Sequence, residues 1–225
     1  MPYCDLRVEI KDKAKAASFA KLLGINYIGL ETAEIGERVD EVELVKILVL
    51  RPRSDEELRS MIRKVRNKVE VVIVESDEYD LIRLACSDTR VDLLSLVYPR
   101  GAESFDHICA RLASENNVAI EINFSFMLNS KNRVRTFRAL RKVIMLCEKY
   151  KTPMIIVSGA RDEWELRAPR DLASIASVLG MDVARAIEGV SDIPFNLIKR
   201  NREKLSGKRI GDALKVVEGG DLNEA

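Results

Sequence analysis

The chain has 225 residues, the length of one ordinary domain or of a close pair of small ones. Its 47% hydrophobic residues suffice for a sizeable core, which excludes a disordered protein and a small disulfide-stabilised scaffold. With 37 basic and 36 acidic residues the formal net charge is +1, so the chain as a whole is not a polycation. Any contact with nucleic acid must come from local clusters of charge.

No segment of the sequence predicts a membrane span or an export signal. The longest apolar stretches, 42–50 and 69–74, have the length of a strand, whereas a bilayer needs about 20 apolar residues. The four cysteines (Cys4, Cys86, Cys109 and Cys147) are far apart and form no C-x-x-C pair, so we expect buried thiols. We therefore expect a cytoplasmic protein without membrane contact. The absence of glutamine and the many charged side chains favour a heat-adapted source.

Strand-like and helix-like segments alternate along the first 160 residues. The strand-like runs are 3–9, 27–31, 44–50, 70–75, 91–96, 118–124 and 154–158, and the helix-like segments are 12–23, 55–68, 78–85, 105–116 and 133–151. The acidic segment 32–41 is too short for a standard helix. Three further helices, 169–179, 182–188 and 194–205, follow without a clear eighth strand.

This order predicts an α/β fold with a single domain over residues 1–205. Regular alternation requires parallel strands joined by right-handed crossovers, and seven of them close most simply into a barrel. We expect an irregular TIM-like barrel of about seven parallel strands with extra C-terminal helices; a doubly wound open sheet is the alternative. Residues 206–225 contain four glycines and end in polar residues, which predicts a loosely ordered tail.

Two of the predicted strands carry charged side chains on the face that we assign to the barrel lumen. The first strand alternates Cys4, Leu6, Val8 and Ile10 with Asp5, Arg7 and Glu9, and the sixth alternates Ile120 and Ile122 with Glu121 and Asn123. Buried charges persist only when paired, so we expect Arg7 to contact Glu121, Asp5 or Glu9. We favour a structural ion-pair layer over a ligand pocket. The single histidine, His107, lies on the polar side of its helix, and we expect no metal, cofactor or catalytic residue.

Positive charge is concentrated in three places. The first run is Lys131, Arg133, Arg135, Arg138, Arg141 and Lys142, the second is Lys199, Arg200, Arg202, Lys204, Lys208 and Arg209, and the third is Arg161, Arg167 and Arg170 around a helix that starts at Pro169. Such places can hold phosphate. Solvated helix faces and surface ion networks are the alternative interpretation. Only Tyr150 and Phe195 are near the first two runs, so contacts with phosphates are expected rather than base stacking.

A set of short motifs in the second half resembles a known family. The motifs are AIEINFS at 119–125, the arginine-rich helix, YKTPMIIVSGA at 150–160, ELRAPRDL at 165–172, LGM at 179–181 and VSDIP at 190–194. Together they resemble the third protein component of archaeal ribonuclease P, the counterpart of the eukaryotic thirty-kilodalton subunit. The first half matches only in the order of its strands and helices.

The resemblance implies a non-catalytic subunit that helps a catalytic RNA to remove the 5′ leader from precursor tRNA. Its implied partners are the ribonuclease P RNA, other protein subunits, especially a small α/β protein, and precursor tRNA through the complex. The family fold is a barrel similar to that of metal-dependent PHP-type phosphoesterases, whose first strand carries an Asp-x-His-x-His pattern. Here that strand reads Asp5-Leu6-Arg7-Val8-Glu9, which argues against a self-sufficient nuclease.

On this basis we predict an RNA-binding scaffold subunit. The predicted RNA-binding residues are Lys131, Arg133, Arg135, Arg138, Arg161, Arg167, Arg170, Lys199, Arg200, Arg202 and Lys204. The predicted structural residues of the lumen are Asp5, Arg7, Glu9, Glu121 and Asn123. Two alternatives remain: a barrel metallophosphoesterase or sugar-phosphate enzyme that uses the lumen carboxylates and the Ser158–Gly159 corner, and a subunit that binds only proteins.

Overall fold

A computed structural model describes residues 1–210 and 214–215, and its main sheet holds seven parallel strands. They lie side by side in the order in which they occur along the chain: β1 (Cys4–Asp5), β2 (Tyr27–Leu30), β4 (Val42–Leu50), β5 (Val71–Ser76), β6 (Leu93–Leu96), β7 (Ala119–Asn123) and β8 (Met154–Val157). The short strand β3 (Arg38–Val39) pairs antiparallel with the start of β4. The seven strands predicted from the sequence are all present; β3 was not predicted.

The two edges of this sheet meet just beyond β1. Val8 forms a parallel bridge with Ala160, which follows β8, and the Val8 N–H donates to the Gly29 carbonyl at 3.0 Å. The next N–H, of Glu9, donates to the Ala160 carbonyl at 2.7 Å. Because the Val8–Ala160 bridge and the bond from Glu9 join the last strand to the first, the sheet is a nearly closed barrel. The prediction of a barrel rather than an open sheet is confirmed.

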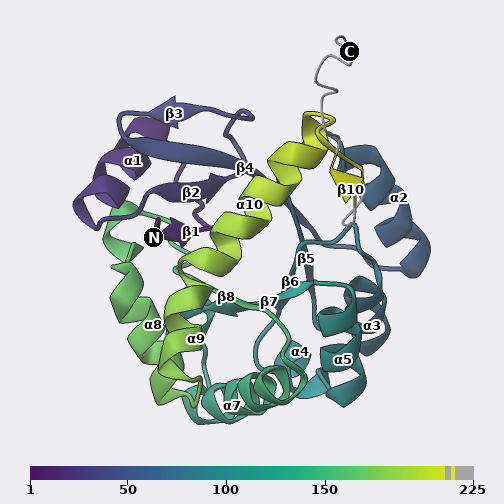
Figure 1. The fold of residues 1–225 in the computed structure, drawn as a ribbon. Helices are drawn as coiled ribbons and strands as arrows, with labels where there is room; N and C mark the ends of the chain where they lie inside the picture. Colours follow the sequence, from purple (N-terminus) through teal and green to yellow (C-terminus); the bar gives the residue numbers. More distant parts are fainter. Residues whose placement is uncertain (211–213, 216–225) are drawn as a thin grey trace, which may run out of the picture.

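Helices surround this barrel on the outside (Figure 1). They are α1 (Lys13–Leu22), α2 (Asp55–Val65), α3 (Tyr79–Ser87), α4 (Arg100–Ser104), α5 (His107–Glu115), α6 (Phe124–Leu128), α7 (Arg133–Tyr150), α8 (Pro169–Val178), α9 (Val183–Gly189) and α10 (Asp192–Leu205), with a 3-10 turn at Glu163–Glu165. The two five-residue helices α4 and α6 were not predicted. Phe124, expected to end a strand, begins α6 because the Asn123 side chain caps that helix by accepting the Phe126 N–H at 3.1 Å.

The helix α10 closes the end of the barrel at which the strands begin. It crosses over that end in Figure 1, and its Leu197 and Ile198 pack into the apolar core of the lumen. The buried Asn201 fixes the helix in place, since its amide donates to the Glu70 carbonyl and to Asp92 Oδ1, both at 2.8 Å. The opposite end, where the strands finish, is therefore the open mouth of the barrel.

The first strand departs from the predicted alternation. Cys4 and Leu6 pack in the lumen core rather than toward the helices. The strand is only two residues long and its chain passes close to β2, where a Cβ on Gly29 would lie 2.5 Å from the Leu6 carbonyl oxygen. The expected two-sided arrangement of residues 4–10 is therefore wrong, although Arg7 does enter the lumen.

Other sequence expectations are tested by burial. The four cysteines are buried free thiols, and His107 is exposed at the start of α5, as predicted. Most of the predicted tail, at 211–213 and 216–225, lies outside the described residues; within the rest, β9 (Arg209–Ile210) pairs antiparallel with β10 (Leu214–Lys215). In the described part of the chain, none of the helices has the length and apolar character needed to cross a bilayer.

Candidate functional site: a charged lumen and basic surfaces

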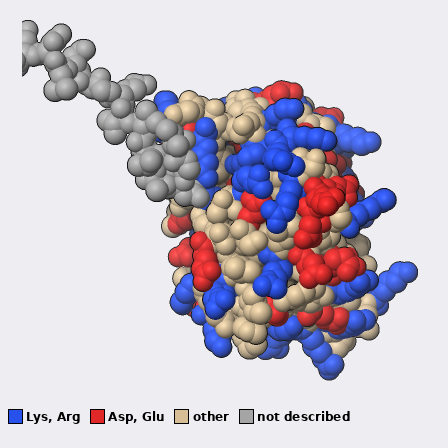
Figure 2. Space-filling model, turned by 90° about the vertical axis from the view of Figure 1, so that its right-hand side faces the viewer, with Lys and Arg blue, Asp and Glu red and all other residues tan. Residues whose placement is uncertain are grey.

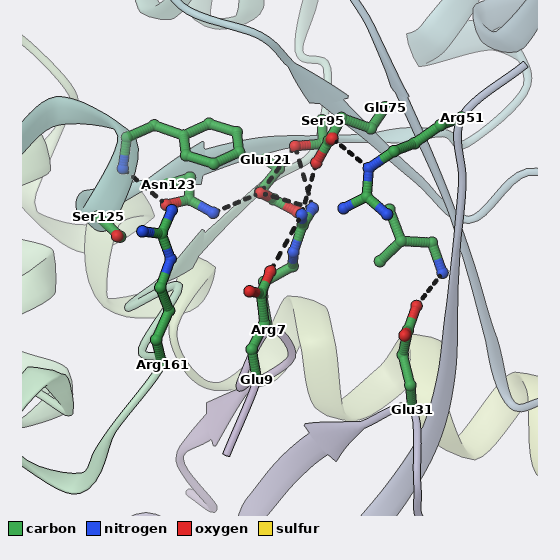
Figure 3. A network of polar contacts seen from close by, with 12 residues as sticks. Arg7, Glu9, Glu31, Arg51, Glu75, Ser95, Glu121, Asn123, Ser125 and Arg161 are labelled. Atoms are coloured by element: carbon green, nitrogen blue, oxygen red, sulfur yellow. Dashed lines mark hydrogen bonds and ion pairs between the residues drawn. The ribbon is translucent and has the colours of Figure 1, made fainter. Parts of the chain in front are cut away.

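Arg7 is the centre of a polar layer inside the barrel (Figure 3). Its side chain is 1% exposed, and Nη2 lies 2.5 Å from Glu75 Oε2 and 3.5 Å from Glu9 Oε1. Its other terminal nitrogen, Nη1, lies 3.5 Å from Glu121 Oε1 and donates to Ser95 Oγ at 3.3 Å. One buried guanidinium therefore bridges carboxylates from β5, β7 and the mouth of the barrel.

A second set of donors completes this layer. The Ser95 hydroxyl and the Asn123 amide both donate to Glu121 Oε1, at 2.9 and 2.8 Å. Arg51, at the end of β4, donates to Glu75 Oε1 at 2.6 Å. The sequence had indicated Glu121 and Asn123, but it missed Glu75, whose place two residues after Ile73 on β5 was a signal that could have found it.

The electrostatics favour the charged forms of Arg7 and Glu75. Burial opposes the charge on Arg7, but Glu121, Glu75 and Glu9 together outweigh that effect and raise the pKa of Arg7 above its ordinary value. Burial likewise acts to raise the pKa of Glu75, and the nearby Arg7 and Arg51 more than offset it, so the pKa of this carboxyl is lowered. The contacts therefore support a structural ion-pair layer.

The lumen does not fit a metal centre of the PHP type. The position that a cation would take among the carboxylates holds the guanidinium of Arg7, whose positive charge repels a divalent ion. Among residues 1–210 and 214–215, no group of three or more His, Cys, Asp or Glu side chains is arranged to hold a metal. The lumen also leaves Arg7 Nε and Glu121 Oε2 without a hydrogen-bond partner in the structure.

The first basic run, on α7, is divided between two roles. Arg135 makes a bidentate contact with Glu103 of α4, with both bonds at 2.6 Å, and Lys142 donates to the Glu103 carbonyl at 2.9 Å. These two bases therefore hold α7 against α4. Arg133 and Arg138 are exposed.

Two arginines of the second run, Arg200 and Arg202, contact the carboxylates at the floor of the barrel, and their predicted contact with RNA stays a prediction. Arg202 bonds Glu43 and Glu70, both at 2.5 Å, and Arg200 lies 3.7 Å from Asp92. The carboxylates at the starts of the strands require cations once α10 covers them, and these arginines supply the charge. Lys199, on the same helix, is exposed.

The third basic place, after β8, does not gather its arginines around one point. Arg167 donates to the carbonyls of Trp164 and Leu166 at 2.6 and 2.8 Å, so it holds its own loop. Arg170 donates to the Tyr3 hydroxyl at 3.3 Å. Arg161 is exposed at the mouth of the barrel (Figure 3). The three arginines that were expected to form one phosphate site therefore point to three separate places.

A further basic surface, which the sequence interpretation missed, lies on α2 and the residues after it. Five bases without an acidic residue between them follow the acidic first turn of the helix: Arg59, Arg63, Lys64, Arg66 and Lys68. Arg66 pairs with Asp92 at 2.5 Å, and Asp92 also pairs with Arg200 of α10, so the ends of α2 and α10 lie together. Figure 2 shows Lys and Arg side chains gathered on the upper part of the face that carries α2.

With this geometry established, comparison with known proteins assigns the chain. A family model described as RNase P subunit p30 matches residues 5–206. The chain belongs to this family. The ribonuclease P protein component 3 of Methanococcoides burtonii is 32% identical over 193 residues, covering 82% of this chain and 80% of that protein. The component 3 of Methanothermobacter thermautotrophicus is 28% identical over 173 residues, covering 76% and 71%.

A chain of a solved structure has the same fold as this protein. A chain in the cryo-EM structure of archaeal ribonuclease P with mature tRNA superposes with a TM-score of 0.78 and 22% identity, covering 97% of this chain and all of that one. The resemblance read from the motifs between Val118 and Leu205 is thus confirmed, and the match extends through the first half, where the sequence showed only the order of elements.

Proposed function

We propose that this chain is a non-catalytic protein subunit of an archaeal ribonuclease P and helps a catalytic RNA to remove the 5′ leader from precursor tRNA. The observation that carries the proposal is the lumen of a family member in which Arg7 lies among Glu75, Glu121 and Glu9. A buried arginine that is salt-bridged to carboxylates stays protonated, so it cannot act as a general acid or base on a phosphodiester. It also cannot coordinate a metal ion. The metal-assisted attack of water then belongs to the RNA.

The partners follow from this role: the ribonuclease P RNA, the other protein subunits, and precursor tRNA through the complex. The protein would act by neutralising phosphates and stabilising the active arrangement of the RNA. A small α/β subunit remains the protein partner that we favour.

A cleavage assay tests the function. We expect the cognate catalytic RNA with its other protein subunits to cleave precursor tRNA faster when this chain is added, and the chain alone to cleave nothing in the presence of magnesium, manganese or zinc. The rival interpretation, a barrel metallophosphoesterase, predicts tightly bound metal by elemental analysis and a phosphatase activity that chelation removes. Either of those results, or cleavage that does not depend on the chain, contradicts the proposal.

For the RNA-binding surface we propose the adjoining ends of α2 and α10. Arg59, Arg63, Lys64 and Lys68 are exposed on the α2 side, and Lys199 is exposed on the α10 side. Of the residues predicted from the sequence, the proposal keeps Lys199 and Lys204, which lie on the helix that Arg200 and Arg202 attach to the barrel floor. A hollow of about 760 Å³, lined in part by Asn67, Lys199 and Lys208, connects the two helix ends.

This surface predicts a specific dependence on salt. Each phosphate contact contributes a slope of about −0.9 in log affinity against log salt for a duplex and about −0.7 for a single strand. Replacing Arg63, Lys64 and Lys68 by alanine should therefore flatten the slope by about two to three and weaken binding to different RNAs by similar factors. The measurement is a fluorescence-anisotropy titration of the catalytic RNA over a range of salt concentrations.

The matched control replaces three exposed bases elsewhere, Arg133, Arg138 and Arg141 of α7, and should leave the slope nearly unchanged. If the control flattens the slope and the α2 variant does not, the RNA lies on α7, as the sequence first indicated. If neither changes the slope, the RNA surface must be sought at the barrel mouth around Arg161.

A further inference from the structure

The outer face of α7 exposes apolar side chains in an unusual number. In the described part of the chain, ten large hydrophobic residues are exposed, and four of them lie on α6 and α7: Leu128 at 43%, Val134 at 62%, Phe137 at 39% and Met145 at 62%. Scattered exposed hydrophobic residues are normal, but a group of them marks an interaction surface. The RNA-binding surface proposed above does not use this face.

The same face is positively charged. Val134, Arg138, Arg141 and Met145 follow one another at spacings of four, three and four residues, which places them in one row along the helix. Between Asn129 and Cys147 the chain contains no acidic residue. Arg135 and Lys142 are bound to Glu103 at the side, whereas Arg138 and Arg141 meet no carboxylate among the described residues. The row therefore places two uncompensated guanidinium groups between two exposed apolar side chains.

This combination fits a protein better than an RNA. Phosphates call for charge alone, and burying Val134 and Met145 against them gains nothing. Protein interfaces are instead enriched in arginine, methionine and aromatic residues. We propose that the outer face of α7 is the docking surface for a partner protein that presents carboxylates between two apolar contacts. The proposal rests on the proposed function, which supplies the candidates: the other protein subunits of the cognate ribonuclease P.

The chain itself holds α7 in place, without a partner. Its inner side is anchored in the core by Leu140, Val143, Ile144 and Cys147, all 1% exposed or less. The Asn132 side chain caps its start by accepting the Arg135 N–H at 3.1 Å. A rigid helix of 18 residues, about 27 Å long, presents its outer row at little cost in conformational entropy. Figure 1 places α7 at the opposite side of the barrel from α2, so a partner bound there leaves the proposed RNA surface accessible.

The test uses the full-length chain and each of the other purified protein subunits of the cognate enzyme in turn. We expect one of them to bind the wild-type chain in isothermal titration calorimetry and to bind Val134→Glu/Met145→Glu at least tenfold more weakly. Arg138→Glu/Arg141→Glu should weaken the same subunit by a similar factor, and wild-type binding should weaken as salt is raised. The matched control is Val178→Glu on α8, which is 83% exposed and should bind like the wild type.

Because the substituted side chains are exposed, all variants should keep the wild-type thermal transition, which circular dichroism checks. The proposal is overturned if the wild-type chain binds none of the subunits, if the α7 variants bind them unchanged, or if those variants lose affinity for the catalytic RNA instead. Failure of the proposed function is a separate result: it shows as cleavage that does not depend on the chain, whatever the calorimetry gives.

Discussion

Replacing Arg7 by methionine should lower the free energy of unfolding by about 3–5 kcal/mol, the range found when one partner of a buried ion pair is removed. The methionine fills much of the same volume, so the loss comes mainly from the carboxylates: Glu121 is left without a cation, and Glu75 keeps only the exposed Arg51. Denaturant unfolding at neutral pH, followed by circular dichroism, measures it. RNA affinity below the transition should change little, since Arg7 is 1% exposed.

Two further variants isolate the cause. Arg51→Met removes the other arginine on Glu75, but its side chain is 57% exposed, so the loss should stay below about 1 kcal/mol. The double variant Arg7→Met/Glu121→Gln also removes the charge of Glu121, which the single variant leaves uncompensated. It should therefore be more stable than Arg7→Met. If Arg7→Met unfolds like the wild type, water reaches the lumen and the ion-pair layer is not buried in solution.

The strands of the barrel could be read from the sequence because they are buried on both faces. Runs such as residues 71–74 and Met154–Val157 are continuous apolar segments of strand length, and this signal is local. The elements that were missed are β3, α4, α6, β9, β10 and the 3-10 turn; each has two to five residues and is too short to show a period. What sets α6 is a single cap, Asn123, which the sequence interpretation had assigned to the lumen.

The lumen was only partly predictable because its pairing is not local. Alternation within one strand places Glu121 and Asn123 correctly, but which carboxylate meets Arg7 depends on how β5 lies across the barrel from the first strand. The contact with Glu75 spans 68 positions of the sequence. The first strand itself escaped the rule of alternation, since it ends at Asp5 and the chain beyond it bends around Gly29.

Basic residues show the same limit more sharply. A count of charges along the chain cannot distinguish an arginine that faces solvent from one, such as Arg202, that neutralises the floor of the barrel. It also hides bases that share a helix with acids, as on α2, where Asp55, Glu56 and Glu57 occupy the first turn and the bases follow. In the folded chain the two ends of that helix are separate surfaces.

Asp5 gives the fold a dependence on pH that can be tested directly. Its carboxyl is 1% exposed and accepts the Ser158 N–H at 3.2 and 3.3 Å, at the seam where the first and last strands meet. Burial raises the pKa of Asp5 from 3.8 to about 6, against the lowering effect of the Ser158 hydrogen bonds. The native state therefore holds this proton over a range of pH in which the unfolded chain has lost it.

The consequence is a loss of stability as the pH rises. Below about pH 4 the carboxyl is protonated in both states and costs nothing; between about 4 and 6 the unfolded state loses the proton first; above about 6 the full cost is present. The shift from 3.8 to about 6 corresponds to about 3 kcal/mol. Asparagine at this position is neutral at every pH, so the stability of Asp5→Asn relative to the wild type should rise by up to about 3 kcal/mol between pH 4 and pH 7.

Denaturant unfolding of both proteins in steps of half a pH unit measures this difference directly. The comparison cancels the contributions of other groups, among them Glu75, whose lowered pKa acts in the opposite direction and costs stability as the pH falls. Glu41→Gln is the matched control, because the Glu41 side chain is 73% exposed and its substitution should change the stability by less than about 1 kcal/mol. A flat difference for Asp5→Asn would mean that this carboxyl is solvated, and hence that the seam between the first and last strands is open to water rather than closed as the Val8–Ala160 bridge and the bond from Glu9 indicate.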